Sequence, residues 1–225
     1  QECQAMGIST ILGPAINIKR SPLCGRNFEY YSEDPYAASE LAASMIQGVQ
    51  SKNVGTSVKH FLANNQEKRR MTSSSDVDER ALREIYLTAF EGAVKEGEPW
   101  TVMNSYNRIN GKYVGESKEY LTDILRNEWG FDGYVVSDWG AVNDRVESLK
   151  AGLDLEMPSS GGMNDALIVE AVKDGTLDES VVDTACERII DIIFRYAENR
   201  DLDAKLDLRE DHETAAAIEE ECIVL

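Results

Sequence analysis

The feature that most limits the fold of this chain is an alternation of apolar, strand-like runs with amphipathic, helix-like runs. The strand-like runs cover residues 10–18, 54–61, 100–106, 133–137 and 153–157. The helix-like runs cover residues 36–51, 82–93, 118–129, 143–151, 164–173 and 179–197, with Asp78 placed to cap the second of them. Such an alternation predicts parallel strands joined by crossover helices, and therefore an α/β fold.

The number of strands and the long loops after them favour one α/β architecture. All five predicted strands lie before residue 160, and this pattern suits a (β/α)8 barrel, which takes ~250 residues when complete. We therefore expect residues 1–198 to be a TIM-like barrel that lacks its N-terminal units. An open doubly wound sheet is the alternative, although no GxGxxG motif follows a strand to support a dinucleotide-binding form.

Both ends of the sequence indicate a piece of a longer chain. Residues 1–8 already resemble a helix that runs into a strand, and there is no initiator methionine. Residues 199–211 are dense in charge, and a helix-like run at 214–221 and an apolar, strand-like end at 222–225 follow them. Because an unpaired strand is a poor place for a chain to stop, we predict that residues 199–225 are a linker and the beginning of a second domain.

Composition and charge exclude several classes of protein. Apolar residues make up 42% of the chain and charged residues 28%, which is typical of a folded globular protein. Acidic residues outnumber basic ones by 41 to 23, for a net charge of −18, and such a surface repels nucleic-acid backbones. The apolar runs fall far short of the ~20 residues that a membrane-spanning helix needs. We therefore expect neither a nucleic-acid partner nor a membrane.

The cysteines and histidines do not predict a metal site. The four cysteines, Cys3, Cys24, Cys186 and Cys222, are far apart and form no CxxC pair, and the chain has only two histidines. Ordinary buried thiols are the favoured interpretation, and two disulfides are the alternative. No metal or organic cofactor is predicted.

Polar residues follow several predicted strands, at the positions where barrel enzymes carry their catalytic groups. From the first strand to the fourth, these residues include Arg26, Lys59-His60, the segment 104–107 and Asp138-Trp139. Packing alone does not explain so many polar groups at one rim. We therefore expect these side chains to meet in a site.

Asp138 is the central candidate, because it directly follows a short strand and should emerge at the mouth of a barrel. A carboxylate there can be a nucleophile, a base, a metal ligand or a structural cap. The adjacent Trp139 offers a flat apolar platform that suits the C–H face of a sugar ring. This pair favours a carbohydrate substrate.

A set of hydrogen-bond donors accompanies this carboxylate. Arg26, Lys59, His60 and Tyr106 each have an ordinary structural explanation when taken alone. Together they form the ring of donors that a polyhydroxylated substrate requires. Neighbouring cations would also keep Asp138 ionised, as a nucleophile must be.

A series of motifs in fixed order extends over nearly the whole chain. They are Gly13-Pro14, Ile18–Pro22, Gly25–Glu29, Ser32–Pro35, Val58–Phe61, Asn64–Glu67, Met103–Asn107, Asn110-Gly111, Val136–Ala141 and Ala151–Pro158. Through them the chain resembles the N-terminal catalytic domain of glycoside hydrolase family 3, of the β-glucosidase type.

The resemblance implies roles for the candidate residues. Asp138 is expected to be the catalytic nucleophile, and Trp139 to shape the sugar-binding subsite. The glycosyl hydroxyls are expected to bind Arg26, Lys59, His60 and Tyr106, with Met103 lining the pocket. The expected activity is a retaining β-glycoside hydrolase that releases terminal β-D-glucosyl residues from oligosaccharides or from aryl and alkyl glycosides, without a cofactor.

The resemblance also implies parts that this sequence does not contain. The family takes its acid/base glutamate from a second, α/β sandwich domain, of which residues 199–225 would hold only the beginning. It also uses an aspartate from an earlier loop, and nothing before Gly13 supplies one. The branch that cleaves N-acetylglucosaminides carries an Asp-His pair, which the stretch 61–70 lacks. The chain alone is therefore expected to be inactive.

Three other functions stay open at this point. One is a β-xylosidase or another exo-β-glycosidase of the same family. Another is a non-catalytic remnant that binds sugars without cleaving them. The third is an aldolase-like barrel that forms a Schiff base through Lys59.

Overall fold

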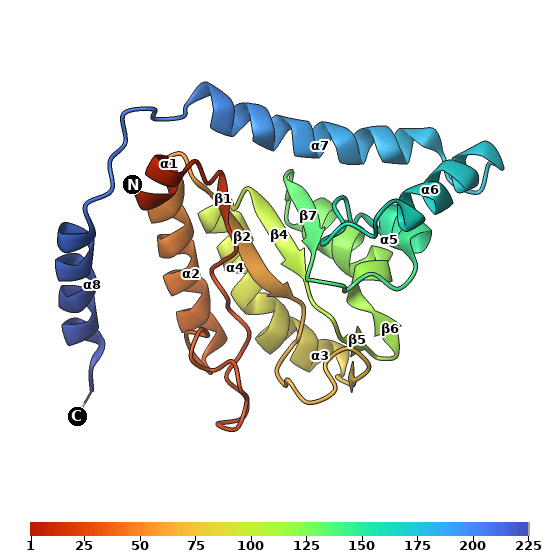
Figure 1. The fold of residues 1–225 in the computed structure, drawn as a ribbon. Helices are drawn as coiled ribbons and strands as arrows, with labels where there is room; N and C mark the ends of the chain where they lie inside the picture. The colour runs from red at the N-terminus through yellow and green to blue at the C-terminus, as the bar shows by residue number, and fades with distance from the viewer. Residues whose placement is uncertain (225) are drawn as a thin grey trace.

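Four strands pair side by side in one parallel sheet. The computed structural model describes residues 1–224 of the chain. The order in the sheet is β1 (Thr10–Ile11), β2 (Gly55–Phe61), β4 (Thr101–Asn104) and β7 (Tyr134–Ser137). Every neighbouring pair runs parallel, and helices connect the strands (Figure 1). The predicted α/β fold with crossover helices is confirmed.

Two predicted strands are much shorter than expected. Of residues 10–18, only β1 and a single parallel bridge from Ala15 to Lys59 join the sheet, since Pro14 between them has no N–H to donate. Of residues 153–157, only Leu155 forms a bridge, to Val136 of β7. There the Asp154 carboxylate accepts the Val135 N–H in place of a backbone carbonyl.

Helices cover one face of the sheet and form the main core with it. They are α2 (Pro35–Gln50), α3 (Glu79–Ala81), the π-helical η1 (Leu82–Leu87), α4 (Thr88–Gly97) and the π-helical η3 (Glu119–Glu128). Asp78 caps α3 by accepting the Ala81 N–H, as predicted. Helices α2 and α4 pack so closely that a Cβ atom added to Gly92 of α4 would lie 1.7 Å from the Oγ of Ser39 in α2. Apolar residues of these helices pack on Val58, Val102 and Val135 of the sheet.

Helix α7 (Glu179–Glu198) crosses the amino ends of the strands (Figure 1). Asn53, just before β2, donates its side-chain amide to the Tyr196 carbonyl, and Arg195 lies over the Trp100 ring just before β4. A smaller core holds α5 (Arg145–Ala151), α6 (Met163–Lys173) and α7 together. The opposite, carboxyl ends of the strands are therefore left to the loops.

The C-terminal segment differs from the prediction. Helix α8 (Leu208–Cys222) includes the predicted helix 214–221 but begins earlier, because the Asp207 carboxylate caps it and acids in its first turn favour the positive end of the helix dipole. The strand predicted at 222–225 is wrong for Cys222, which is helical, and for residues 223–224, which form no strand. Leu225 lies outside the described residues.

A second, small sheet was not predicted. It consists of β3 (Ser74–Ser75), β5 (Arg108–Ile109) and β6 (Lys112–Tyr113), in the order β3-β5-β6, and is followed by a short 3-10 helix, η2 (Val114–Glu116). These two-residue strands are too short for an alternating pattern to reveal them. The sheet ties the loop after β2 to the loop after β4.

The short N-terminal helix α1 (Glu2–Met6) precedes β1. All four cysteines are free, so the expectation of thiols rather than disulfides is confirmed. The expectation that they are buried is wrong, because Cys186 and Cys222 are exposed and the other two are partly so. Along residues 1–224, no helix is both long and apolar enough to cross a membrane.

Candidate functional site

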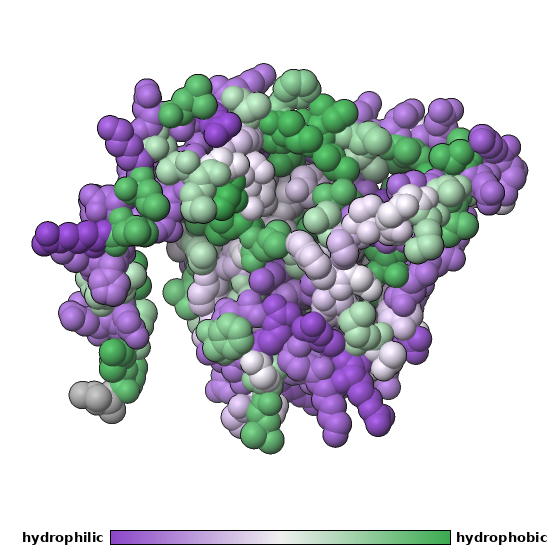
Figure 2. Space-filling view, viewed as in Figure 1, coloured by the Kyte–Doolittle hydropathy of each residue, from purple (hydrophilic) through white to green (hydrophobic). Residues whose placement is uncertain are grey.

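The carboxyl ends of β2, β4 and β7 and the loop after β1 bring the predicted site residues to one rim. Lys59 and His60 lie near the carboxyl end of β2, Met103 lies in β4, and Asp138 directly follows β7. In Figure 2, hydrophilic side chains gather over the loops on this side of the molecule. Because parallel strands end at the same edge, residues from four separate parts of the sequence meet here.

Asp138 has one oxygen bound and one free. Its Oδ1 accepts the Trp139 backbone N–H at 2.8 Å. Its Oδ2 is buried and has no hydrogen-bond partner within the described part of the chain. The His60 Nε2 lies 3.6 Å from that oxygen. A carboxylate held by one oxygen and left unsatisfied at the other is suited to react with, or bind, a group that arrives from outside.

His60 is almost fully buried, and Asn17 fixes its ring. The Asn17 Nδ2 donates to the His60 carbonyl at 2.9 Å, and its Oδ1 accepts the His60 backbone N–H at 2.9 Å. The same Oδ1 lies 3.2 Å from the His60 Nδ1. Since this oxygen can only accept, the ring proton is on Nδ1, and Nε2 presents a lone pair to the site.

The His60 ring is neutral at physiological pH. Burial, followed by the positive charges of Arg26, Lys59 and Arg70, lowers the pKa of His60 to about 2. His60 therefore neither supplies a proton to a reaction near neutral pH nor forms a true ion pair with Asp138.

Arg26 and Lys59 share one carboxylate. The Glu29 Oε1 accepts from the Arg26 Nε, and the Glu29 Oε2 lies 3.4 Å from the Lys59 Nζ. All three side chains are about four-fifths shielded from solvent. Two positive charges are thus held beside His60, and through it beside Asp138.

Tyr106 and Arg70 form the next part of the rim. The Tyr106 hydroxyl donates to the Trp139 carbonyl at 3.0 Å, and the Arg70 guanidinium lies 4.4 Å above the Tyr106 ring. Burial, and secondly the charge of Asp138, raises the pKa of Tyr106 to about 12. Tyr106 therefore stays protonated and serves as a hydrogen-bonding group. The Arg70 guanidinium is held by Glu67, at 2.7 Å.

The two remaining predicted residues differ in exposure. Trp139 is 43% exposed, beside Asp138, which leaves its ring available as a platform. Met103 is buried in β4 and stands outside the main helix-facing core, on the other face of the sheet. Its register partner on β7 is Val136.

The structure adds residues that the sequence patterns did not single out. Glu29 and Glu67 lie within quoted motifs, but no role was predicted for them. Asn17 and Arg70 become visible only through their contacts with His60 and Tyr106. A polar residue in an apolar strand-like run, as at position 17, was the one sequence signal that could have revealed any of them.

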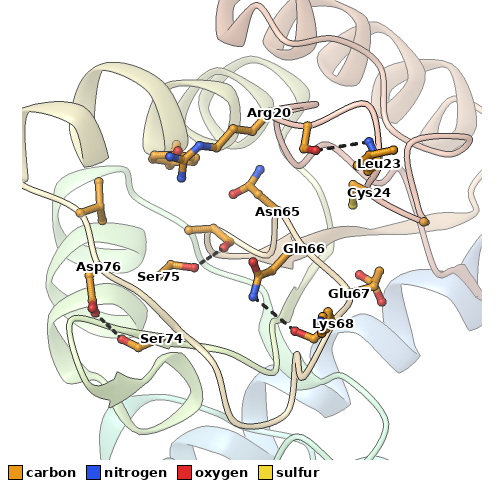
Figure 3. A pocket seen from close by; sticks show the side chains of 15 residues that line it. Arg20, Leu23, Cys24, Asn65, Gln66, Glu67, Lys68, Ser74, Ser75 and Asp76 are labelled. Atoms are coloured by element: carbon orange, nitrogen blue, oxygen red, sulfur yellow. Dashed lines mark hydrogen bonds between the residues drawn. The ribbon is translucent and has the colours of Figure 1, made fainter.

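A pocket of about 590 Å³ lies beside this rim, between the loop after β1 and the loop after β2 (Figure 3). Its wall includes Arg20, Cys24 and Glu67, and the Ser75 hydroxyl closes one side by donating to the Ala63 carbonyl. Asp138 does not line it. The two sites share the Glu67 side chain, which faces the pocket and holds Arg70.

The chemistry available here is that of a carboxylate with surrounding donors. Across residues 1–224, no three His, Cys, Asp or Glu side chains gather in a way that could hold a metal ion. The residues that meet are the half-satisfied carboxylate of Asp138, three cations, a neutral imidazole, a phenol and an indole. Such a set suits a neutral substrate with several hydroxyl groups.

The comparison with protein families gives a direct result. The family model described as "Glycosyl hydrolase family 3 N terminal domain" matches residues 1–192. The chain belongs to glycosyl hydrolase family 3.

Two relatives with similar sequences are named as glycosidases. Thermostable beta-glucosidase B of Acetivibrio thermocellus is 59% identical over 225 residues, which is all of this chain and 30% of that protein. An exo-alpha-(1->6)-L-arabinopyranosidase of Bifidobacterium longum is 54% identical over 193 residues, or 86% of this chain and 25% of that protein. The chain therefore spans less than a third of the length of these relatives.

Solved structures show the same fold. The GH3 beta-glucosidase of Bifidobacterium adolescentis matches with a TM-score of 0.91 and 49% identity, over 95% of this chain and 32% of that one. Beta-glucosidase 3B of Thermotoga neapolitana, in complex with alpha-D-glucose, matches with a TM-score of 0.91 and 46% identity, over 95% of this chain and 31% of that one.

Proposed function

We propose that this chain forms the nucleophile-bearing part of a retaining β-glycoside hydrolase that releases terminal β-D-glucosyl residues. The observation that carries the proposal is the Asp138 Oδ2, a buried carboxylate oxygen with no partner among the described residues, surrounded by sugar-compatible donors. The family membership and the named relatives support the same activity.

Asp138 acts as the nucleophile in this proposal. Its Oδ2 attacks the anomeric carbon of the bound sugar and forms a covalent glycosyl ester, while the aglycone oxygen leaves with a proton from an acid. Water then attacks the same carbon and frees the sugar with its original anomeric configuration. The hydrogen bond from the Trp139 N–H to Oδ1 holds the carboxylate in place.

The surrounding groups bind the sugar hydroxyls. Arg26 and Lys59 donate hydrogen bonds, and His60 accepts a hydrogen bond from a hydroxyl group through the free lone pair on Nε2. Tyr106 fixes the backbone of Trp139, whose ring packs on the sugar. Met103 lines the pocket from β4.

The acid/base comes from outside this chain. Two carboxyl groups ~5–5.5 Å apart are needed for retention, and a second, α/β sandwich domain supplies the other one in our proposal. We further propose that residues 1–198 are part of a TIM-like barrel and that residues 199–225 are the linker and the beginning of that domain. The parallel sheet, which Ala15 and Leu155 extend on its two sides, and the greater length of the relatives support this arrangement. The longer protein that contains this chain is called the full-length protein below.

A Schiff-base reaction at Lys59 is disfavoured. The Lys59 Nζ lies 3.4 Å from the Glu29 carboxylate, which holds it as an ion-pair partner and not as a free nucleophile. A pentopyranoside substrate is the second candidate, because the relative at 54% identity is named an arabinopyranosidase.

Hydrolysis of a panel of aryl glycosides tests the function. The full-length protein is expected to cleave 4-nitrophenyl β-D-glucoside, with β-D-xyloside and α-L-arabinopyranoside as the competing substrates. Proton NMR during the first minutes should show β-D-glucose as the first product. Release of α-D-glucose first would contradict retention, and the absence of cleavage of all three substrates would contradict the proposed activity. The 225-residue chain, tested in parallel, is expected to release no sugar.

A further inference from the structure

Glu29 touches both cations of the site but not Asp138. It lies in the loop after β1, three residues beyond Arg26, while Lys59 comes from β2. One Glu29 oxygen binds the Arg26 Nε, and the other lies 3.4 Å from the Lys59 Nζ. With side-chain exposures of 19% for Arg26, 16% for Lys59 and 21% for Glu29, the cluster is largely shielded from water. Contacts of this kind hold their geometry better than exposed ion pairs do.

This carboxylate affects how Lys59 can be used. A lysine has a flexible four-carbon stem and a compact charge that seeks an anion. The charge of Lys59 reaches His60, whose pKa it helps to lower, and His60 lies 3.6 Å from Asp138. With Glu29 present, Lys59 has an anion other than the nucleophile to pair with, and the Asp138 Oδ2 stays free.

The same carboxylate also determines which part of Arg26 is available. Glu29 engages the Nε atom, and the two Nη atoms make no hydrogen bond with residues 1–224. A guanidinium held at Nε keeps its two outer nitrogens in a fixed plane, from which they can donate side by side to neighbouring hydroxyl groups.

We propose that Glu29 is a positioning residue that aims Arg26 and Lys59 at the hydroxyls of the sugar and keeps Lys59 away from the nucleophile. This inference rests on the proposed function and assigns Glu29 no contact with the substrate. Its effect on binding and catalysis passes through the two cations.

The substitution Glu29→Gln in the full-length protein tests this role, because it removes the charge and keeps the shape. The kcat/KM for an aryl β-glucoside is expected to fall about 10- to 100-fold, as for the loss of hydrogen bonds from charged groups. Glu33→Gln is the matched control, an exposed carboxylate four residues further along the same segment. It is expected to keep wild-type activity.

A double-mutant cycle separates positioning from a general structural effect. In a Lys59→Met background, Glu29→Gln should lower kcat/KM by a clearly smaller factor than in the wild-type protein, since one of the two groups that it positions is already gone. Thermal midpoints of the variants verify folding, and Glu29→Asp, which keeps the charge, replaces Glu29→Gln if the latter does not fold. Full additivity of the two losses, or wild-type kcat/KM in Glu29→Gln, would overturn the proposal.

A binding measurement keeps this result distinct from the proposed hydrolysis. Titration with glucono-δ-lactone by calorimetry is expected to show weaker binding to Glu29→Gln than to Glu33→Gln, by a similar factor. If the wild-type protein binds the lactone but cleaves no glycoside, the proposed activity fails while the positioning role is still tested by the ratio of dissociation constants. Equal dissociation constants for the two variants would contradict it.

Discussion

Two buried aspartates flank strand β7, and their surroundings differ. Asp154 binds the Val135 N–H at 2.7 Å near the start of the strand, and its oxygens also accept from Arg126 at 2.6 Å and Arg188 at 2.9 Å. Asp138, just past the end of the strand, binds a single N–H and leaves Oδ2 without a partner among the described residues. Both carboxylate oxygens accept hydrogen bonds in the aspartate at one end of β7, whereas one of the two does so in the aspartate at the other end.

The difference separates structural stabilisation from reactivity. A buried polar atom without a hydrogen bond costs free energy, and among such side-chain atoms within residues 1–224 the Asp138 Oδ2 is the one carboxylate oxygen. Both oxygens of Asp154 accept hydrogen bonds that hold β7, η3 and α7 together. In our proposal, the free Oδ2 of Asp138 is the atom that reacts with the substrate.

The charged neighbours of the two aspartates also differ. Burial, and then the charge of Arg188, lowers the pKa of Arg126 to about 10 even though Asp154 opposes this, so Arg126 remains charged at neutral pH. The pKa of His60 is lowered to about 2, chiefly by burial, so Asp138 has a neutral neighbour. The Asp154 carboxylate is therefore shared by two arginines, whereas the imidazole beside Asp138 carries no charge.

The largest expected effect concerns the activity of Asp138→Asn. An amide cannot form the glycosyl ester, so the kcat/KM of the full-length protein for an aryl β-glucoside should fall by about four orders of magnitude or more. The amide oxygen can still accept the Trp139 N–H, so the unfolding midpoint in urea should stay close to wild type. A large loss of stability in this variant would mean that Asp138 is structural, like Asp154.

The next largest effect is the reverse case, Asp154→Asn. It leaves Arg126 and Arg188 without their shared negative charge, and breaking a buried pair of this kind costs about 3–5 kcal/mol of unfolding free energy. Urea unfolding followed by tryptophan fluorescence measures the loss. Glu187→Gln, an exposed position on the same helix α7, is the control and should unfold like wild type. An equally stable Asp154→Asn would remove the contrast drawn between the two aspartates.

A smaller effect concerns pH and His60. Its folded pKa of about 2 lies below its ordinary 6.5, so the unfolded state binds more protons between these values and stability falls as pH decreases through that window. Between pH 7 and pH 5 this proton uptake costs about 2 kcal/mol. His60→Gln should lose that part of the pH dependence, and the exposed His212→Gln should keep it. If the unfolding free energies of wild type and His60→Gln changed with pH in parallel, the conclusion that His60 is buried and neutral would be contradicted.

The smallest effect is expected for an exposed ion pair. Arg80 and Glu84 lie 3.0 Å apart on the surface, with their side chains 83% and 61% exposed. Glu84→Gln should change the unfolding free energy by less than about 0.5 kcal/mol, because solvent screens such pairs. Urea midpoints at low and high salt measure this. A change as large as that of Asp154→Asn would show that burial is not what distinguishes these ion pairs.

The sequence predicted the elements whose pattern is local. Helix α2 begins at Pro35, as the Asp-Pro pair in the sequence predicts. The periodic apolar residues at 82–93 pack on the sheet as expected. The parallel order β1-β2-β4-β7 follows from the alternation of strands and helices. The short second sheet and the end of α8 were missed or misread, because two-residue strands have no period and a short apolar end resembles a strand.

The sequence predicted which residues gather at the site, but it did not predict the contacts between them. Strand ends indicated Lys59, His60 and Asp138, because chain order and strand direction are visible in a sequence. The contacts of Asn17 with His60 and of Glu29 with Lys59 join residues 43 and 30 positions apart. Such pairings depend on the exact path of loops, which no local pattern encodes.

Covalent labelling tests the central claim most directly. A 2-deoxy-2-fluoro β-glucoside with a good leaving group slows the second step of a retaining reaction, so the glycosyl ester accumulates on the nucleophile. Peptide mass spectrometry of the treated full-length protein is predicted to find the label on Asp138, and no label in Asp138→Asn. A label on another carboxylate, with Asp138 unmodified, would contradict the role assigned to the free oxygen of Asp138.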